Sequence, residues 1–287
     1  MESRRIDGDG ELVALSEFAA PMQADPHTYL AYLGTEPSGI AAELAETTWQ
    51  DVSVVTLVDG DLVGWLVGDV DPDMGRVWWN GPFVQHDDWE SVADALLEAG
   101  REQLCTEVTE EEMAVDARFD RYRSWAARHG FTEDEGSHVL RLDGPVDPPV
   151  SPVREITNAD HSTVIRLHDD LFGGTHTTGE QLVAGHDAEH RRLVVEFDGE
   201  VAGYVAVELE PDGSGYVDYV GVDPRHRRRG FGADLVRAGV VELLELGAHG
   251  VGLTVRADIV GARDLYVSLG FEEERFVVPL RRGFSLA

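Results

Sequence analysis

The sequence predicts two mixed α/β (α+β) domains in tandem, each with a central sheet flanked by helices. Three segments of the first half recur in the second half at a nearly constant spacing of 139 or 140 residues. The matching pairs are 54–65 with 193–204, 75–84 with 215–224, and 125–131 with 265–271. A repeat of this kind indicates two copies of one structural unit, and 287 residues suit two domains better than one. The proline-rich segment 143–153 has the composition of a linker, so we expect domains at 1–146 and 147–287.

Each half is expected to follow the order strand, one or two helices, hairpin, strand, helix, strand, helix, strand. The hairpins are predicted by Asp-Gly turns between apolar runs, and the helices by apolar residues at helical spacing. Thr177 and Glu180 are spaced like a capping box. In the second half the expected elements are strand 153–156, helix 159–172, hairpin 193–210, strand 215–223, helix 231–248, strand 250–258, helix 261–270 and strand 271–280.

The chain is strongly acidic, with a formal net charge of −32, and every basic residue other than histidine is arginine. Residues 1–146 carry a net charge of −22 and residues 147–287 carry −10. Such a charge argues against nucleic acid or an anionic membrane as the partner. It is compatible with a cationic small substrate, and equally with a role in solubility alone.

The composition also predicts a cytoplasmic protein. The lone cysteine, Cys105, can build neither a disulfide framework nor a zinc site, and no spacing of histidines suggests a metal. The amino terminus lacks the apolar segment of a signal peptide. No apolar run is long enough to span a membrane. A monomer and a homodimer both remain open.

The segment 225–232, RHRRRGFG, gathers positive charge in this acidic chain. It lies between a predicted strand and a predicted helix, so its backbone N–H groups are placed at a helix N-terminus, where anions bind. Gly230 and Gly232 allow close approach of an anion, and arginine offers forked donors to phosphate. The segment lacks the GK[ST] of a nucleotide P-loop and the full dinucleotide fingerprint. A solvated basic loop and a nucleic-acid contact are the alternatives.

The surrounding residues resemble the GNAT superfamily of acyl-CoA-dependent N-acyltransferases. The pyrophosphate loop of that family, [RQ]-x-x-G-x-[GA], matches 227–232, and its preceding V-x-V-x-P matches 220–224. The downstream A-x-x-L-Y-x-x-x-G-F matches Ala262 through Phe271. The resemblance covers about 153–281, with a degenerate echo in the first half. The tandem layout is similar to that of the mycothiol synthase family, although no further signature identifies the acceptor.

The resemblance implies an acetyl-CoA site in the second domain. The backbone amides of residues 228–233 would hold the pyrophosphate, and the strand 220–222 would pair with the pantetheine arm and polarise the thioester carbonyl. The implied cofactor-binding residues are Val220, Gly221, Val222, Arg227, Arg228, Arg229, Gly230, Phe231, Gly232, Ala233 and Ala262.

Two residues are candidates for proton transfer. Tyr266 matches the position that the family often uses as general acid toward the departing thiolate; a packed helical aromatic is its alternative. Asp218 lies inside the strand before the loop and is a candidate general base. Counted alternately, it shares a face with Val220 and Val222. A carboxylate acting through water, such as Glu208, is the alternative base.

Two positions depart from the family pattern. Ile259 stands where the family often has asparagine, and Arg228 stands where it usually has glycine. In the first domain the loop falls on residues 87–92, which have no glycine and three acidic residues, and the tyrosine falls on Ala126. We therefore expect the first domain not to bind the coenzyme.

The sequence as a whole predicts an N-acetyltransferase that moves an acetyl group from acetyl-CoA to a primary amine by direct attack. The acceptor is unidentified, and the acidic composition favours a cationic amine weakly. The alternative is a sensor that binds acyl-CoA without turnover. Ile259 favours the sensor, whereas Tyr266 together with Asp218 favours the enzyme.

Overall fold

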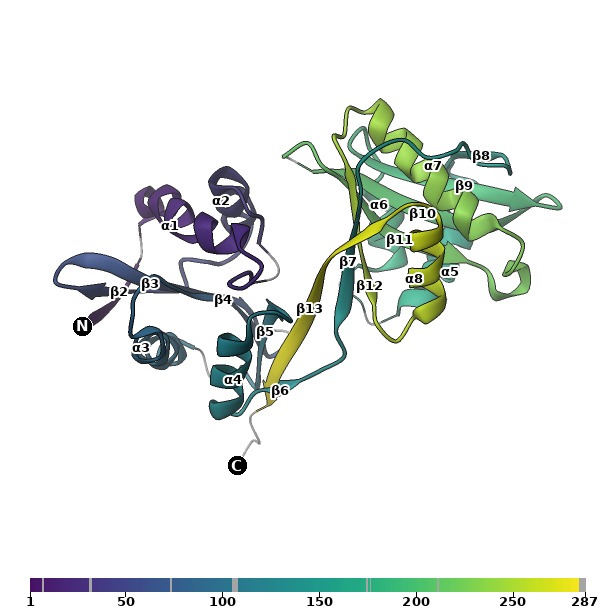
Figure 1. Ribbon diagram of the computed structural model, residues 1–287. Coiled ribbons are helices and arrows are strands. Elements are labelled where there is room, and N and C mark those ends of the chain that lie inside the picture. The colour runs from purple at the N-terminus through teal and green to yellow at the C-terminus, as the bar shows by residue number, and fades with distance from the viewer. Residues whose placement is uncertain are drawn as a thin grey trace. The chain divides into compact units, whose positions relative to one another are not determined.

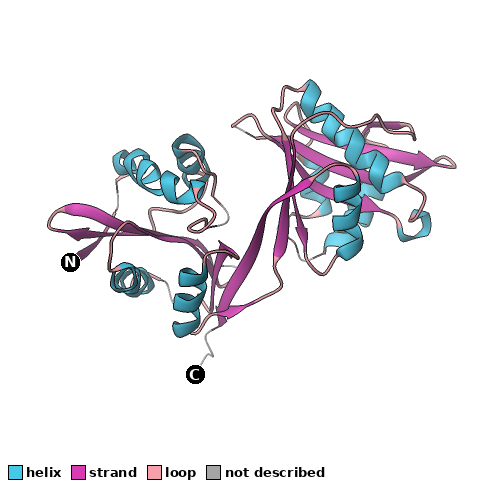
Figure 2. Ribbon diagram, in the orientation of Figure 1, coloured by secondary structure: helices cyan, strands magenta, loops and turns pink. Residues whose placement is uncertain are grey.

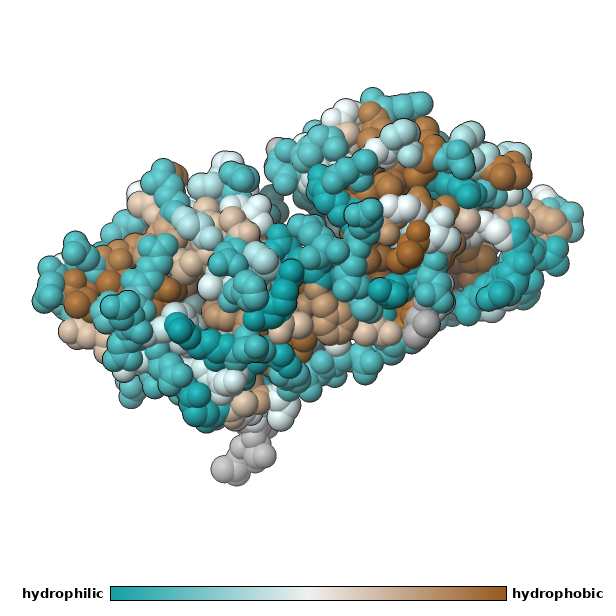
Figure 3. Space-filling model, in the orientation of Figure 1, coloured by the Kyte–Doolittle hydropathy of each residue, from teal (hydrophilic) through white to brown (hydrophobic). Residues whose placement is uncertain are grey.

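The computed structural model describes the whole chain except residues 7, 31–32, 73, 105–107, 174, 176, 211 and 284–287, so Cys105 lies outside the described residues. The chain forms two compact units, residues 1–136 with 275–287 and residues 137–274. Both have the predicted architecture of a mixed sheet with helices (Figures 1 and 2). The visible surface is largely hydrophilic, in keeping with the charged composition (Figure 3).

Unit 1 contains a sheet with the strand order β1-β2-β3-β4-β5-β13, with β6 beside β13. Helices α1 and α2 lie on one face of this sheet and α3 and α4 on the other (Figure 2). The elements in chain order are β1 (Glu2–Arg5), η1 (Asp9–Glu11), α1 (Leu12–Ala24), α2 (Pro37–Ala45), β2 (Val52–Val58), β3 (Asp61–Asp71), β4 (Arg76–Val84), α3 (Trp89–Arg101), β5 (Glu110–Asp116), α4 (Asp120–Arg128) and β6 (Thr132–Glu133).

Unit 2 contains a sheet with the order β7-β12-β11-β10-β9-β8. Its neighbours pair antiparallel except β11 with β12, which pair parallel. Its elements are β7 (Ser137–Leu142), β8 (Val153–Glu155), α5 (His161–Phe172), α6 (Gly179–Ala184), β9 (His190–Phe197), β10 (Glu200–Leu209), β11 (Gly215–Val222), η2 (Pro224–His226), α7 (Phe231–Glu245), β12 (Val251–Arg256) and α8 (Val260–Ser268), and the chain continues into β13 (Glu272–Gly283).

The element order confirms the predicted repeat. Matching places in the two units are occupied by three pairs of elements, namely β4 and β11, α3 and α7, and α4 and α8. One local prediction is wrong: the capping box consists of Thr178 and Gln181, one residue later than expected. Thr178 accepts a hydrogen bond from the Gln181 amide, and the Gln181 side chain accepts one from the Thr178 amide.

The units divide the chain at different residues from the expected 146/147 because two strands are exchanged. β7 lies before the proline-rich segment but pairs antiparallel with β12 of unit 2. Residues 277–283 of β13 end the second repeat but pair antiparallel with β5 of unit 1. Each sheet therefore contains one strand from the other half of the sequence.

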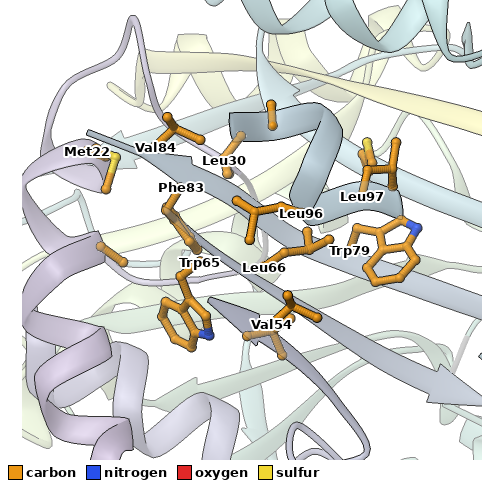
Figure 4. Packing of buried hydrophobic residues seen from close by; sticks show 14 of the residues in the cluster. Met22, Leu30, Val54, Trp65, Leu66, Trp79, Phe83, Val84, Leu96 and Leu97 are labelled. Carbon is orange, nitrogen blue, oxygen red and sulfur yellow. The ribbon is translucent and has the colours of Figure 1, made fainter. Parts of the chain in front are cut away.

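The cores lie between the sheets and their helices. In unit 1, large side chains such as Trp65, Trp79 and Phe83 pack with Leu66 and Leu96 (Figure 4). In unit 2, one apolar cluster joins the sheet to α7 and a second joins it to α5 and α6. These cores hold β11 and the start of α7 in place, and the predicted coenzyme site lies there.

Candidate functional site

A β-bulge shapes the middle of β11. In its pairing with β10, Val217 lies opposite Val207 and Tyr219 lies opposite Ala206, so Asp218 is an extra residue with no partner in the register. A bulge bends a strand and breaks the alternation of its side chains. Bulges often lie beside active sites for this reason.

The bulge places Asp218 on the α5 face of the sheet. Val217, Val220 and Val222 pack in the cluster with α7 on the other face, whereas the ring of Tyr219 lies against His168 and Phe172 of α5. The expectation that Asp218 shares a face with Val220 and Val222 is therefore wrong. The expectation assumed that side chains alternate between the two faces along the whole strand. The bulge inserts one extra residue and so breaks this alternation.

The parallel strands β11 and β12 separate soon after they begin to pair. Their register contains only Gly215 with Val251 and Tyr216 with Gly252. Within the described residues, the β12 side of β11 therefore has no strand beside it from Val217 to Val222. The N–H and C=O groups of an open strand edge can pair with an extended ligand, as the predicted pairing of residues 220–222 with the pantetheine arm requires.

Of the two glycines near this edge, Gly221 permits a close contact, whereas Gly232 leaves room for a Cβ. A Cβ on Gly221 would lie 2.5 Å from Cε1 of Tyr204, so any side chain at this position would collide with that ring. A Cβ on Gly232 would meet Leu265 of α8 at 3.4 Å. Ala262 and Tyr266 of α8 pack against the same cluster as Val220 and Val222.

The loop from Asp223 to Gly230 joins β11 to α7, and residues 227–230 are exposed. Arg228 and Gly230 both have positive φ values, of 63° and 89°. Gly230 is the N-cap of α7 and has no side chain to cap the helix. Among the described residues, none of the backbone amides from 228 to 233 donates a recorded hydrogen bond, so these donors are available to an anion.

The arginines of this loop differ in their partners. Arg225 is paired with Asp223, and this arginine lowers the pKa of Asp223 to about 2. Arg229 lies over the ring of Phe197 at 4.7 Å. Arg227 and Arg228 take part in no ion pair within the described chain, and they remain as exposed positive charges beside the free amides.

Asp218 has the electrostatics of a general base. Its pKa is raised to about 7, first by burial and then by the negative charge of Glu208, while Arg192 and His190 act in the opposite direction. Arg192 is almost fully buried and donates its hydrogen bonds to the carbonyls of Leu182 and Val207. A carboxyl group with a pKa near 7 can accept a proton at neutral pH.

Glu208, the alternative base, lies on the neighbouring strand. Its carboxylate is 3.9 Å from Nε2 of His190, and its side chain is 28% exposed.

Tyr266 remains protonated at neutral pH. Burial raises its pKa to about 12, and the nearby Tyr216 adds to the increase. Its ring packs edge-on against Phe271, with centroids 5.9 Å apart. Tyr216 itself has a pKa raised to about 12, mainly by burial, and bonds to Thr254. Sequence reasoning did not identify Tyr216, which lies two residues before Asp218 and could have been found by its place in the same strand.

A buried hydrogen-bonded chain, also missed by sequence reasoning, lies beside Asp218. The Tyr204 hydroxyl is 2.7 Å from Nδ1 of His168, whose Nε2 is 3.0 Å from the carbonyl oxygen of Thr177. Since a carbonyl only accepts, Nε2 carries the proton and Nδ1 accepts from Tyr204. The chain ties the segment between α5 and α6 to the centre of the sheet.

The same region of unit 1 has lost these features. Asp88 is the N-cap of α3, and its side chain accepts from the amide of Ser91 at 3.4 Å. Trp89, in the loop position, is buried, and Ala126, in the tyrosine position, is fully buried. A carboxylate of the chain therefore occupies the helix end that an anion would need.

The described residues contain no group of three or more histidine, cysteine, aspartate or glutamate side chains that could hold a metal ion. No helix of the described chain is both long and apolar enough to cross a membrane.

Comparisons with known proteins agree with this geometry. The profile of the acetyltransferase (GNAT) family matches residues 161–271. Mycothiol acetyltransferase from Thermomonospora curvata is 30% identical over 140 residues, which are 49% of this chain and 43% of that protein. Mycothiol acetyltransferase from Saccharopolyspora erythraea is 37% identical over 164 residues, which are 51% of this chain and 54% of that protein. The alignments thus span about half the length of these relatives.

Solved structures show the same fold over nearly the whole chain. A GCN5-related N-acetyltransferase from Sphaerobacter thermophilus superposes with a TM-score of 0.79 at 18% identity, covering 98% of this chain and 95% of its own. A tandem GNAT protein from the clavulanic acid biosynthesis pathway superposes with a TM-score of 0.70 at 15% identity, covering 100% and 99%. Residues 161–271 are therefore similar to the acetyltransferase (GNAT) family, and the chain as a whole has the fold of these solved structures, one of which is a tandem GNAT protein.

Proposed function

We propose that unit 2 is an acyl-CoA-dependent N-acyltransferase that moves the acetyl group of acetyl-CoA to a primary amine. The observation that carries this proposal is the open edge of β11, which leads directly to a positive loop with uncapped amides. The matched family and the relatives named mycothiol acetyltransferases support acetyl transfer. Unit 1, whose helix end is capped by Asp88, is proposed not to bind the coenzyme.

The residues of the site fit the coenzyme. The amides from Arg228 to Ala233 would hold the pyrophosphate, and Arg227 and Arg228 would add charge. The edge of β11 from Val220 to Val222 would hydrogen-bond the pantetheine arm, and one of its N–H groups would polarise the thioester carbonyl.

Two side chains would transfer the protons of the reaction. Asp218 would take a proton from the amine as its nitrogen bonds to the carbonyl carbon. As the carbon–sulfur bond breaks, Tyr266 would donate its hydroxyl proton to the leaving sulfur. Asp218 would then release its proton to solvent, and Tyr266 would take one up from solvent. The products are an amide and free CoA, so charge and atoms balance.

The acceptor is proposed to reach Asp218 from the α5 face, because the bulge turns this carboxylate to that side. Glu208 and His190 lie near it there. A neutral or cationic amine suits this mixed but net negative environment better than an anionic acceptor.

The test is release of CoA thiol when the full chain is incubated with acetyl-CoA and a library of primary amines. We expect at least one amine to give thiol release above the amine-free rate, and Asp218→Asn to lower that rate about 100-fold or more. Binding of acetyl-CoA without thiol release for any amine would instead favour the sensor. The exposed Ile259, which caps α8 without a side-chain hydrogen bond, is the feature that favours that alternative.

A further inference from the structure

Unit 1 contains a cleft of about 370 Å³ beside the end of β4. Its floor is apolar and consists of the buried side chains of Met22, Phe83, Val84, Trp89 and Phe119. In Figure 4, Met22 of α1 lies beside Phe83 and Val84 of β4. Its rim is polar and exposed, with His27, His86, Arg118, Asp120 and Arg121.

The repeat relates this cleft to the coenzyme site of unit 2. β4 and β5 pair in parallel only from Arg76 to Trp78, so the two strands separate as β11 and β12 do. Pro82 to Val84 and Trp89, which line the cleft, correspond to residues 222–224 and 229 at the 140-residue spacing. Unit 1 has therefore kept the opening while losing the loop that would hold a pyrophosphate.

A phosphate-bearing coenzyme does not suit this cleft. The loop position carries Asp87, Asp88 and Glu90 in place of arginines and glycines. These carboxylates would repel the several negative charges of CoA, and Asp88 already caps α3.

The rim nevertheless offers one positive charge to a ligand. Arg121 is exposed and forms no ion pair or hydrogen bond within the described chain. Arg118, its neighbour on the rim, is held by Asp116 at 2.5 Å, and Asp120 lies 3.4 Å from Arg123. The positive charge of Arg121 would repel a cationic ligand, whereas the carboxylate of a ligand could form an ion pair with the Arg121 guanidinium.

We propose that this cleft binds a compact organic acid, with an apolar or aromatic body on the floor and one carboxylate against Arg121. The cleft volume lies at the lower end of the range of roughly 300–1,000 Å³ for small-molecule sites, so it suits a body of one ring or a short chain. The aromatic rings of Phe83, Trp89 and Phe119 offer apolar contact area to such a body. This inference concerns unit 1 alone and does not depend on the activity proposed for unit 2.

The test is calorimetric titration of the full chain with three compounds that share a skeleton and differ in charge: 3-phenylpropanoate, 3-phenylpropanamide and 3-phenylpropylamine. We expect the carboxylate to bind about tenfold or more tightly than the amide, because a charged hydrogen bond replaces a neutral one. The amine should bind more weakly than the amide. Equal binding of all three, or no binding of the carboxylate at millimolar concentration, would overturn the proposal.

Matched variants assign the binding to this cleft. Arg121→Glu should abolish binding of the carboxylate and leave the urea unfolding transition of the chain unchanged, which shows that the variant is folded. Arg166→Glu, an equal charge change at an exposed arginine of α5, should leave carboxylate binding unchanged. Carboxylate binding that survives Arg121→Glu contradicts the proposal. In a Gly230→Glu/Gly232→Glu variant, CoA should not bind to unit 2, so competition between CoA and the carboxylate would place CoA in the cleft and would also contradict the proposal.

Discussion

Asp218 combines three features that no neighbouring carboxylate shares. It is the extra residue of a bulge, it is largely buried, and within the described residues it has no hydrogen-bond or ion-pair partner. A native carboxyl group normally gains a partner and has a lowered pKa. Asp218 instead has a pKa raised to about 7, an arrangement that costs stability and is typical of functional sites.

The first prediction concerns the pH dependence of acetyl transfer. Since the base must be deprotonated, kcat/KM should rise with pH through about 7 and level off above it. Asp218→Asn should abolish this rise of kcat/KM with pH and remove most of the activity. A profile that stays flat from pH 5.5 to 8.5 in the wild type would exclude Asp218 as the base.

The second prediction concerns stability. The pKa of Asp218 is higher in the folded chain than its ordinary value of 3.8, so the folded state binds more protons between these values. Its contribution to the free energy of unfolding therefore falls as pH rises from about 4 to about 7. Asp218→Asn should stabilise the chain by about 2–4 kcal/mol more at pH 8 than at pH 4, as measured by denaturant unfolding at both values. An equal effect at both values would contradict the burial of this charge.

The third prediction separates chemistry from binding at Tyr266. Tyr266→Phe keeps the ring that packs on Phe271 and removes only the hydroxyl. We expect kcat to fall about 10- to 100-fold, with the acetyl-CoA affinity changed less than about twofold. The free energy of unfolding of Tyr266→Phe in urea is the control. A loss of stability or of acetyl-CoA affinity that accounts for the fall in kcat would indicate a structural role for Tyr266.

At the scale of the element, β11 shows where sequence reasoning succeeds and where it stops. The apolar pattern and the glycines predict the limits of β11, its position before the loop and the start of α7 at Phe231. The face of Asp218 could not be predicted, because a bulge depends on the register with β10 and leaves no mark in the pattern of β11 itself. The separation of β11 from β12 likewise depends on pairing rather than on composition.

The fourth prediction tests the close contact between β11 and β10. Gly221→Ala would place a Cβ 2.5 Å from the buried Tyr204 ring, and the overpacking should cost about 1–3 kcal/mol of unfolding free energy. Gly261→Ala, in α8 with no heavy atom within 4 Å of the added Cβ, is the control and should be neutral or stabilising. Equal stability of the two variants in urea would show that β11 relaxes freely.

At the scale of the whole molecule, the exchange of strands is the feature that the sequence did not reveal. The repeat and the proline-rich segment indicated two domains, and both units are present. The sequence predicts the last strand at 271–280, and β13 is observed at Glu272–Gly283, but a pattern predicts a strand and not its partner. As a result the sequence boundary at 146 differs from the structural boundaries at 136/137 and 274/275.

The fifth prediction follows from this exchange. A fragment of residues 147–287 lacks β7, which pairs with β12 along six residues. It also exposes residues 277–283 of β13 without β5. We expect it to aggregate or to unfold at a lower temperature than the fragment 137–274, because unpaired apolar strands associate. Equal melting temperatures would argue that β7 contributes little to unit 2.

The central claim is that acetyl-CoA binds at the RHRRRGFG loop of unit 2. The most direct measurement is calorimetric titration of acetyl-CoA into the wild type and into Gly230→Glu/Gly232→Glu, which brings negative charge to the uncapped amides. Gly247→Glu, at the other end of α7 with a positive φ and open space, controls for backbone strain. We predict micromolar binding by the wild type and by Gly247→Glu, and its loss in the double variant. Unchanged binding in the double variant, or none in the wild type, would contradict the account.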